Sequence, residues 1–254
     1  MMKENDTKAQ TMENTNSDFT PKRRVVEKDA AKRMALKCSE YNGSSSESRN
    51  FKCLEFKDMS FKGEDLSGME AHYSKFTNCE FEECKLVNME AHFAEFENCT
   101  FINCELRNSE FPFSKLSNIK FVNCNLRGTE FQFAQGEISC RGCKMENCDA
   151  QNSILTLTLS SVNAPNFSAN SAHIEFDALD CNLRGSEFND GFVEGQIVQS
   201  DLTNVELNRS NLSMLKLADC AVTGMETEGA IEGNSDPDDI FDMIENESED
   251  EEED

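Results

Sequence analysis

The chain has 254 residues and a formal net charge of -25, with no tryptophan, two tyrosines and 19 phenylalanines. So large an excess of negative charge argues against direct binding to nucleic acid or to an anionic membrane, and favours basic partners. The longest nearly apolar stretch, residues 154–159, is too short to span a bilayer, and the N-terminus lacks the apolar core of a signal peptide. We therefore expect a cytoplasmic protein.

The first fifty residues divide into three segments. Residues 1–20 are polar and are predicted to be disordered. Residues 21–41 predict a basic amphipathic helix, because Pro21 stands at its start and Val26, Ala30, Met34 and Cys38 recur at spacing four. Residues 42–50, NGSSSESRN, form a predicted flexible linker. We expect the helix to cap the domain that follows or to lean on it.

An apolar residue recurs at every fifth position from Phe51 to Phe131. A period of five fits neither an α-helix nor a simple strand. It predicts a square coil in which each five-residue side directs one large and one small residue inward, so that four sides complete a coil of twenty. Coils of this kind stack about 4.8 Å apart and bury their interior only against neighbouring coils.

Many of the 12 cysteines occupy the small inward position of the repeat, two residues before the large one. This regular placement argues for buried thiols in a reducing compartment and against a secreted disulfide scaffold.

The repeat resembles the pentapeptide-repeat proteins, whose consensus is A-(D/N)-L-x-x. Clean matches are CNLRG at 124–128, CNLRG at 181–185 and SDLTN at 200–204. The resemblance covers residues 51–225 and implies an all-β fold, a right-handed quadrilateral β-helix. It is most like the DNA-mimicking, quinolone-resistance branch, whose members are rods that bind DNA gyrase or topoisomerase IV.

The repeat is less regular in its second half. Between about residues 135 and 180 the spacing is kept only loosely, which predicts an irregular coil with a bulge or a short protruding loop. Regularity returns with Leu183, Phe188 and Val193, slips by one residue, and continues from Ile197.

The last segment, residues 226–254, holds no Lys or Arg and fifteen Asp or Glu, and is predicted to be a disordered tail. A small apolar cluster within it is predicted to dock in a groove of a basic partner; the alternative is a tail that only adds solubility. The cluster consists of Ile240, Phe241, Met243 and Ile244.

Residues twenty apart should stand above one another. This defines two outward columns on the same side of the coil, one formed by the residue before each repeat centre and the other by the residue two positions after it. One column is acidic and should be destabilised by mutual repulsion, with no stabilising explanation apparent from the sequence. The other is aromatic, and we predict that both bind a partner. Alternatively, the aromatic column packs near a corner or beneath the N-terminal helix, whose basic residues would then cover the acidic column. The columns are Glu70, Glu90, Glu110 and Glu130, and Tyr73, Phe93, Phe113 and Phe133.

We predict no catalytic, cofactor or metal site, because the interior of so narrow a stack is filled by its own side chains. His72 and His92 are explained by copying of the repeat. Cys140 and Cys143 have a zinc-like spacing, yet no second clean pair follows them.

The leading functional hypothesis is a non-enzymatic, acidic rod that substitutes for DNA and inhibits or protects a DNA-processing enzyme, either gyrase- or topoisomerase-like or a nuclease. The expected partner is a basic DNA-binding protein in a bacterial or phage-infected cell. Homodimerisation stays open, although the relatives dimerise through an apolar C-terminal helix where this chain has its acidic tail. The alternative is a scaffold, or an effector secreted into a host by a non-Sec route, whose rod, helix or tail recruits a partner.

Overall fold

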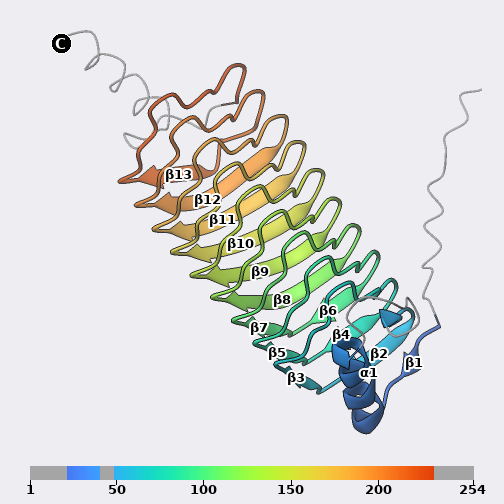
Figure 1. Ribbon diagram of the computed structural model, residues 1–254. Coiled ribbons are helices and arrows are strands. Elements are labelled where there is room, and N and C mark those ends of the chain that lie inside the picture. Colours follow the sequence, from blue (N-terminus) through green and yellow to red (C-terminus); the bar gives the residue numbers. More distant parts are fainter. Residues whose placement is uncertain (1–21, 41–48, 232–254) are drawn as a thin grey trace, which may run out of the picture.

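The computed structural model describes residues 22–40 and 49–231 (Figure 1). The predictions for residues 1–20, for most of the linker and for the tail cluster at 240–244 lie outside these residues. The described part of the chain contains one helix, α1 (Lys28–Glu40), which lies between the first strand and a long array of further strands. The strands are β1 (Arg24–Val25), β2 (Leu54–Lys57), β3 (Ser60–Lys62), β4 (Lys75–Thr77), β5 (Glu80–Glu82), β6 (Glu95–Glu97), β7 (Thr100–Ile102), β8 (Lys115–Val122), β9 (Gln135–Arg141), β10 (Ile154–Ser160), β11 (His173–Leu179), β12 (Phe192–Val198) and β13 (Leu215–Ala218).

Every strand pair is parallel, and each strand of the stack pairs with the equivalent strand one coil away. Phe56 is opposite Phe76, for example, and Phe61 is opposite Phe81. Two further sides of each coil are joined by single parallel bridges, such as the one between Asp65 and Lys85. The square coil predicted from the period of five and the all-β quadrilateral β-helix that the resemblance implies are therefore confirmed.

The interior is a set of stacked columns, as the sequence predicts. All seventeen residues at the repeat centres between Phe51 and Phe131 are buried. Phe61, Phe81, Phe101 and Phe121 stack ring upon ring, with centroids 4.9, 4.7 and 4.9 Å apart. Parallel in-register strands place identical side chains one strand spacing apart, and this spacing is suited to stacked aromatic rings.

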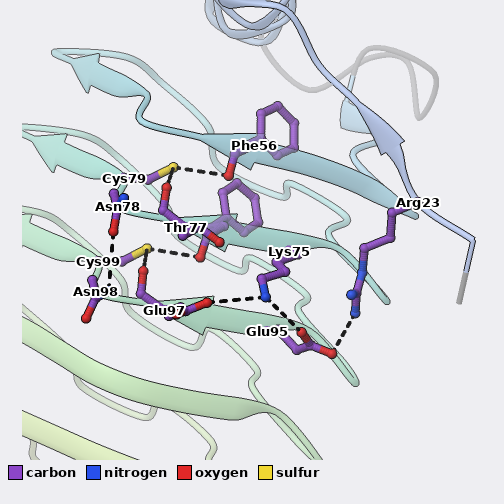
Figure 2. Close-up of polar contacts among 11 residues, drawn as sticks. Arg23, Phe56, Lys75, Thr77, Asn78, Cys79, Glu95, Glu97, Asn98 and Cys99 are labelled. Carbon is purple, nitrogen blue, oxygen red and sulfur yellow. Dashed lines mark hydrogen bonds and ion pairs between the residues drawn. The ribbon is translucent and has the colours of Figure 1, made fainter. Parts of the chain in front are cut away.

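The small inward residues fill space in the core and also donate hydrogen bonds. The thiols of Cys79 and Cys99 each donate to the carbonyl oxygen of a phenylalanine in the coil before, at 3.6 and 3.4 Å (Figure 2). All cysteines whose side chains the structure describes are free thiols. Burial raises the pKa of the Cys148 thiol to about 12, as expected for a thiol that fills space in a core.

The coils turn at corners where the backbone has a positive φ. Asn78, Asn98 and Asn118 occupy one such column with φ of 52–53°, a region that Asn tolerates better than most residues. Their side chains also bond along the column, with Asn118 Nδ2 donating to Asn98 Oδ1 at 2.9 Å. Figure 2 shows Asn78 and Asn98 on successive coils.

The irregularity expected between residues 135 and 180 is a change in coil length with a bulge, and no loop protrudes there. Strands β9, β10 and β11 are seven residues each and pair continuously, but at nineteen-residue spacing, as in the pair of Ile154 with His173. The change begins at a bulge in β8 between Leu116 and Ile119, opposite Gly136. Coils of twenty return at β13, where Gly195 pairs with Leu215.

The N-terminal segment covers the first coil (Figure 1). Strand β1 pairs in parallel with β2, and Val26, Ala31 and Ala35 are buried in the common core. The buried face of α1 is thus turned by one residue from the predicted one, since Ala30 and Met34 are only partly buried. No helix among residues 22–40 and 49–231 is long and apolar enough to span a membrane.

Candidate functional site

One corner of the coil carries aromatic side chains on four successive turns. Their rings stack almost in parallel, with centroids 5.2, 4.9 and 4.7 Å apart and interplanar angles of 3–8°. Each side chain is 36–47% exposed. We call this column the aromatic ladder; it consists of Tyr73, Phe93, Phe113 and Phe133.

The ladder occupies strained backbone. Its four residues have φ of 56–58°, a conformation that bulky side chains rarely adopt and that costs about 1–3 kcal/mol at each position. The other corners are mostly turned by Asn, Asp or Gly, and this same corner continues with Asn152. Stacking offsets part of the cost, yet exposure leaves much of the apolar area in water. A ladder that is both strained and exposed is poorly explained by folding stability alone.

The acidic column lies on the side that leads into this corner. Parallel bridges link Glu70 to Glu90, Glu90 to Glu110 and Glu110 to Glu130, and the column continues with Asp149. The acidic and aromatic columns therefore run along the same edge of the rod.

Three of the four glutamates of this column contact a nitrogen of another side chain, which the sequence analysis did not predict. Lys52 Nζ lies 2.5 Å from Glu70 Oε2. His72 Nε2 lies 3.3 Å from Glu90 Oε2, and His92 Nε2 lies 2.8 Å from Glu110 Oε2. These partners belong to a donor column, the residue that follows each buried centre. The two histidines therefore have a structural role that repeat copying alone does not explain.

The donor column continues beyond the histidines with amides. Gln132 Nε2 donates to Asp149 at 2.8 Å, and Asn170 Nδ2 donates to Glu187 at 2.9 Å. Pro112 interrupts the column, and a proline side chain has no donor. Consequently Glu130 is the one glutamate of the predicted four that receives no side-chain hydrogen bond or ion pair from the described residues.

His72 contributes little positive charge to this edge at neutral pH. Burial lowers its pKa, and the nearby charges of His92 and Lys52 lower it further against the opposing effect of Glu90 and Glu70. Its Nδ1 is buried and has no hydrogen-bond partner among the residues that the structure describes. Because the ring is neutral, its 3.3 Å contact with Glu90 leaves the carboxylate charge in place.

Arg23 binds at the first turn of the ladder. Figure 2 shows its contact with Glu95. Its Nε donates to the carbonyl oxygen of Tyr73 at 2.9 Å, and its Nη2 donates to Glu95 Oε1 at 2.9 Å. Burial of Glu95 opposes ionisation, but Arg23, together with Lys75 and Lys115, outweighs this effect and lowers the pKa of the Glu95 carboxyl. Arg23 also closes one end of a shallow groove of about 310 Å³, which has Phe93 and Phe113 among its lining residues.

The prediction that basic side chains of the helix cover the acidic column does not hold for the described side chains. Within residues 22–35, Arg23 is the side chain that reaches this edge, and it precedes α1. Its carboxylate partner, Glu95, belongs to a neighbouring row. The helix instead packs on the end of the stack, as the first alternative in the sequence analysis has it.

The cysteines considered for metal binding lie in the core of the rod, away from the acidic and aromatic columns. Cys140, Cys143 and Cys148 are buried, and the Cys143 thiol donates to the carbonyl oxygen of Phe121 at 3.4 Å. No cluster of three or more side chains suited to hold a metal ion occurs in the described part of the chain.

Residues 74–155 match a family model described as the pentapeptide repeat region. This segment includes most of the aromatic ladder and the coils that carry the clearest five-residue spacing. Residues 74–155 are thus identified as a pentapeptide repeat region.

Several solved structures are similar to this chain. HetL, which is involved in heterocyst differentiation regulation in the cyanobacterium Nostoc sp. strain PCC 7120, is 14% identical, with 72% of this chain and 88% of HetL covered and a TM-score of 0.33. A trypsin-treated variant of QnrB1, a plasmid-mediated fluoroquinolone resistance protein, is 17% identical, with 73% and 87% covered and a TM-score of 0.40. No curated protein sequence matches the chain. Similarity at this level says nothing about function.

The donor column was missed because counting in twenties finds only residues directly above one another. His92 contacts a carboxylate 18 residues further along the chain, so the pair is diagonal. Diagonal neighbours in a sheet lie within reach of long side chains. A search at spacings of seventeen and eighteen would have found the histidines, the amides and the interruption at Pro112.

Proposed function

We propose that the rod is a non-enzymatic protein-binding module whose acidic and aromatic edge docks against a basic DNA-binding protein. In this proposal it takes the place of DNA on a gyrase- or topoisomerase-like enzyme or a nuclease in a bacterial or phage-infected cell, and inhibits or protects that enzyme. The exposed, strained aromatic ladder is the observation that carries binding to a protein partner, and the acidic column beside it is what favours a DNA-binding partner. Such a surface lowers the stability of the free protein, and a partner that buries the exposed rings offsets this cost.

The charge of the rod supports a basic partner. Residues 51–225 hold fourteen basic and twenty-six acidic side chains, a net charge of -12. Successive ladder rings, and hence successive turns of the acidic column, lie 4.7–5.2 Å apart. One strand of duplex DNA carries a charge about every 3.4 Å. The acidic column therefore has a charge spacing of the same order as one phosphate strand, which a groove adapted to DNA would attract.

The test is competition with DNA. We would assay bacterial gyrase, topoisomerase IV and a non-specific nuclease at several DNA concentrations, with and without the full-length protein. The proposal predicts inhibition of at least one enzyme that more DNA relieves, that weakens with added salt, and that falls when the four glutamates of the acidic column are changed to glutamine. Inhibition that is insensitive both to DNA concentration and to these substitutions would contradict DNA substitution.

One observation favours the alternative of a scaffold or secreted effector. The aromatic ladder has no counterpart in an array of phosphates, and three of the four glutamates already bond to side chains of the chain itself. For a scaffold, partner binding should depend on the ladder and tolerate loss of the acidic column. Replacing Phe93 and Phe113 by serine, in parallel with the glutamine variants, separates the two functions once a partner is in hand.

A further inference from the structure

Pro112 interrupts the donor column, so among the described residues Glu130 lacks the side-chain donor that its neighbours in the acidic column have. Lys52, His72 and His92 each place a nitrogen beside the glutamate of the next coil. Gln132 and Asn170 do the same for Asp149 and Glu187 further along the stack. At Glu130 the position that a donor would fill is occupied by the apolar ring of Pro112.

We propose that Glu130, Pro112 and the flanking rings of Phe113 and Phe133 form a docking site for an arginine side chain of the partner. The inference rests on the proposed function for its partner, and it names the side chain that anchors that partner. The arginine would supply the donor that Pro112 lacks and would lie against the exposed faces and edges of the two rings.

Charge and ring chemistry both favour a cation at this point. Glu130 stands between Glu110 and Asp149 in the same column, so a positive group there is attracted by three carboxylates. Phe113 and Phe133, stacked 4.7 Å apart and 45–47% exposed, offer aromatic surface to the same group. An ion pair and a cation–π contact at one position reinforce each other.

Arg23 shows that a guanidinium fits against this corner, there on the side of Glu95 and Lys115 that follows the ladder. It is almost buried, with 9% of its side chain exposed, while it bonds to the carbonyl oxygen of Tyr73 and to Glu95. The carbonyl oxygens of Phe113 and Phe133 accept no hydrogen bond from the described residues. They therefore offer to a partner the kind of acceptor that Tyr73 offers to Arg23.

The planar, forked donor of arginine suits this site better than the single ammonium of lysine. Arginine can direct one N–H to a carboxylate and another to a carbonyl oxygen while its plane lies against a ring. Arg23 makes two such directed bonds with Nε and Nη2. We therefore expect the site to prefer arginine to lysine.

The experiment measures binding of a fluorescein-labelled tri-arginine peptide to the full-length protein at about 150 mM salt, where general attraction is partly screened. Tri-lysine and tri-citrulline peptides are the controls for planarity and for charge. Glu130→Gln should weaken tri-arginine binding about fivefold, whereas Glu90→Gln and Glu110→Gln, which remove the same charge from paired positions, should change it less than twofold.

A donor swap tests the mechanism without changing the acidic charge. Pro112→His should give Glu130 the partner that His92 gives Glu110, and should weaken binding about as much as Glu130→Gln. The double variant Pro112→His with His92→Pro moves the interruption of the donor column by one coil. Its binding should then depend on Glu110 and no longer on Glu130. Thermal melting of each variant checks that the rod is folded.

The possible results separate this inference from the proposed function. Equal losses from Glu90→Gln, Glu110→Gln and Glu130→Gln, or equal binding of tri-lysine and tri-arginine, would overturn the arginine site even if a DNA-dependent enzyme is inhibited. Selective dependence on Glu130 that follows the donor swap would establish the site even if no such enzyme is inhibited, and DNA substitution would then be the part that fails.

Discussion

At the scale of single residues, neighbouring phenylalanines of one coil have opposite roles. Phe131 is 1% exposed and stacks on Phe111 in the core, whereas Phe133 is 45% exposed at a strained corner. Phe131→Ala should lower the free energy of unfolding by about 3–5 kcal/mol, because it empties a filled site. Phe133→Asn should change it by less than about 1 kcal/mol, since loss of one stacked neighbour is offset by relief at positive φ. Urea unfolding of both variants checks this; similar losses would mean that the ladder is part of the core.

The lack of a donor at Glu130 should reduce stability in the absence of a partner. Its carboxylate faces Glu110 and Asp149 on the adjacent coils, and two unit charges at this range repel by about 1 kcal/mol in water. Glu130→Gln should therefore raise the free energy of unfolding by about 0.5–1 kcal/mol in low salt, and by less in about 0.5 M salt. Glu110→Gln is the matched control and should bring no gain, because it also removes the contact with His92. Destabilisation by Glu130→Gln would show that Glu130 has a stabilising partner.

His72 should make stability depend on pH in a definite direction. Folding lowers its pKa from the ordinary value of 6.5, so the folded state favours the neutral ring. Its contribution is complete above about pH 6.5 and is lost as the pH falls toward the lowered pKa, because the unfolded state then binds the proton more readily. Between pH 7 and 5 the wild type should lose more stability than His72→Gln, a variant that places in the donor column the residue type of Gln132. Parallel losses in chemical denaturation would argue against a shifted His72.

At the scale of elements, β1 is held by a side chain as well as by its backbone. The amides of Arg24 and Val26 bond to the first coil at 2.9 Å, and Arg23 binds Tyr73 and Glu95 beyond it. Arg23→Gln should loosen β1 by about 1.5–3 kcal/mol, the range for a lost hydrogen bond to a charged group, without unfolding the coils. Hydrogen exchange should become faster at Arg24 and Val26 and stay unchanged at Phe101. Unchanged exchange at Val26 would mean that the backbone pairing alone holds the strand.

The elements differ in how far the sequence predicts them. The coils are predictable because every fifth residue must fit a narrow interior, so a break in the pattern at Phe81 or Phe101 would be a defect in the core. The contact of Arg23 with Tyr73 is not predictable in this way, since it joins residues 50 apart that share no period. Likewise, the paired state of Glu110 depends on a diagonal contact. The sequence predicts which residue types lie along this edge. The structure is needed to show which carboxylate lacks a partner among the described residues.

At the scale of the whole molecule, the rod consists of a block of nineteen-residue coils between two blocks of twenty. A glycine marks both changes of length. At Gly136 and at Gly195 a Cβ atom would overlap the carbonyl oxygen of the coil before, that of Leu116 and of Phe176 respectively. The spacing of the sequence falters at these same two places, so its apparent defects mark the points where the coil changes length. In a stack whose coils contact only their neighbours, such junctions are where cooperativity is most easily lost.

Substitution at a junction should therefore separate the blocks. Gly136→Ala places a side chain at a φ of 143° against the backbone of Leu116, and should lower the free energy of unfolding by about 2–4 kcal/mol. Gly63→Ala is the control, because its φ of 67° is also unfavourable for alanine but no atom lies within 4 Å of the added Cβ; its cost should be about 1 kcal/mol. Hydrogen exchange in mild denaturant should show the coils on the two sides of Gly136 opening at different concentrations in Gly136→Ala and together in Gly63→Ala. A single shared transition in both variants would mean that the blocks remain coupled across the change in coil length, and that the two glycines only relieve a local clash.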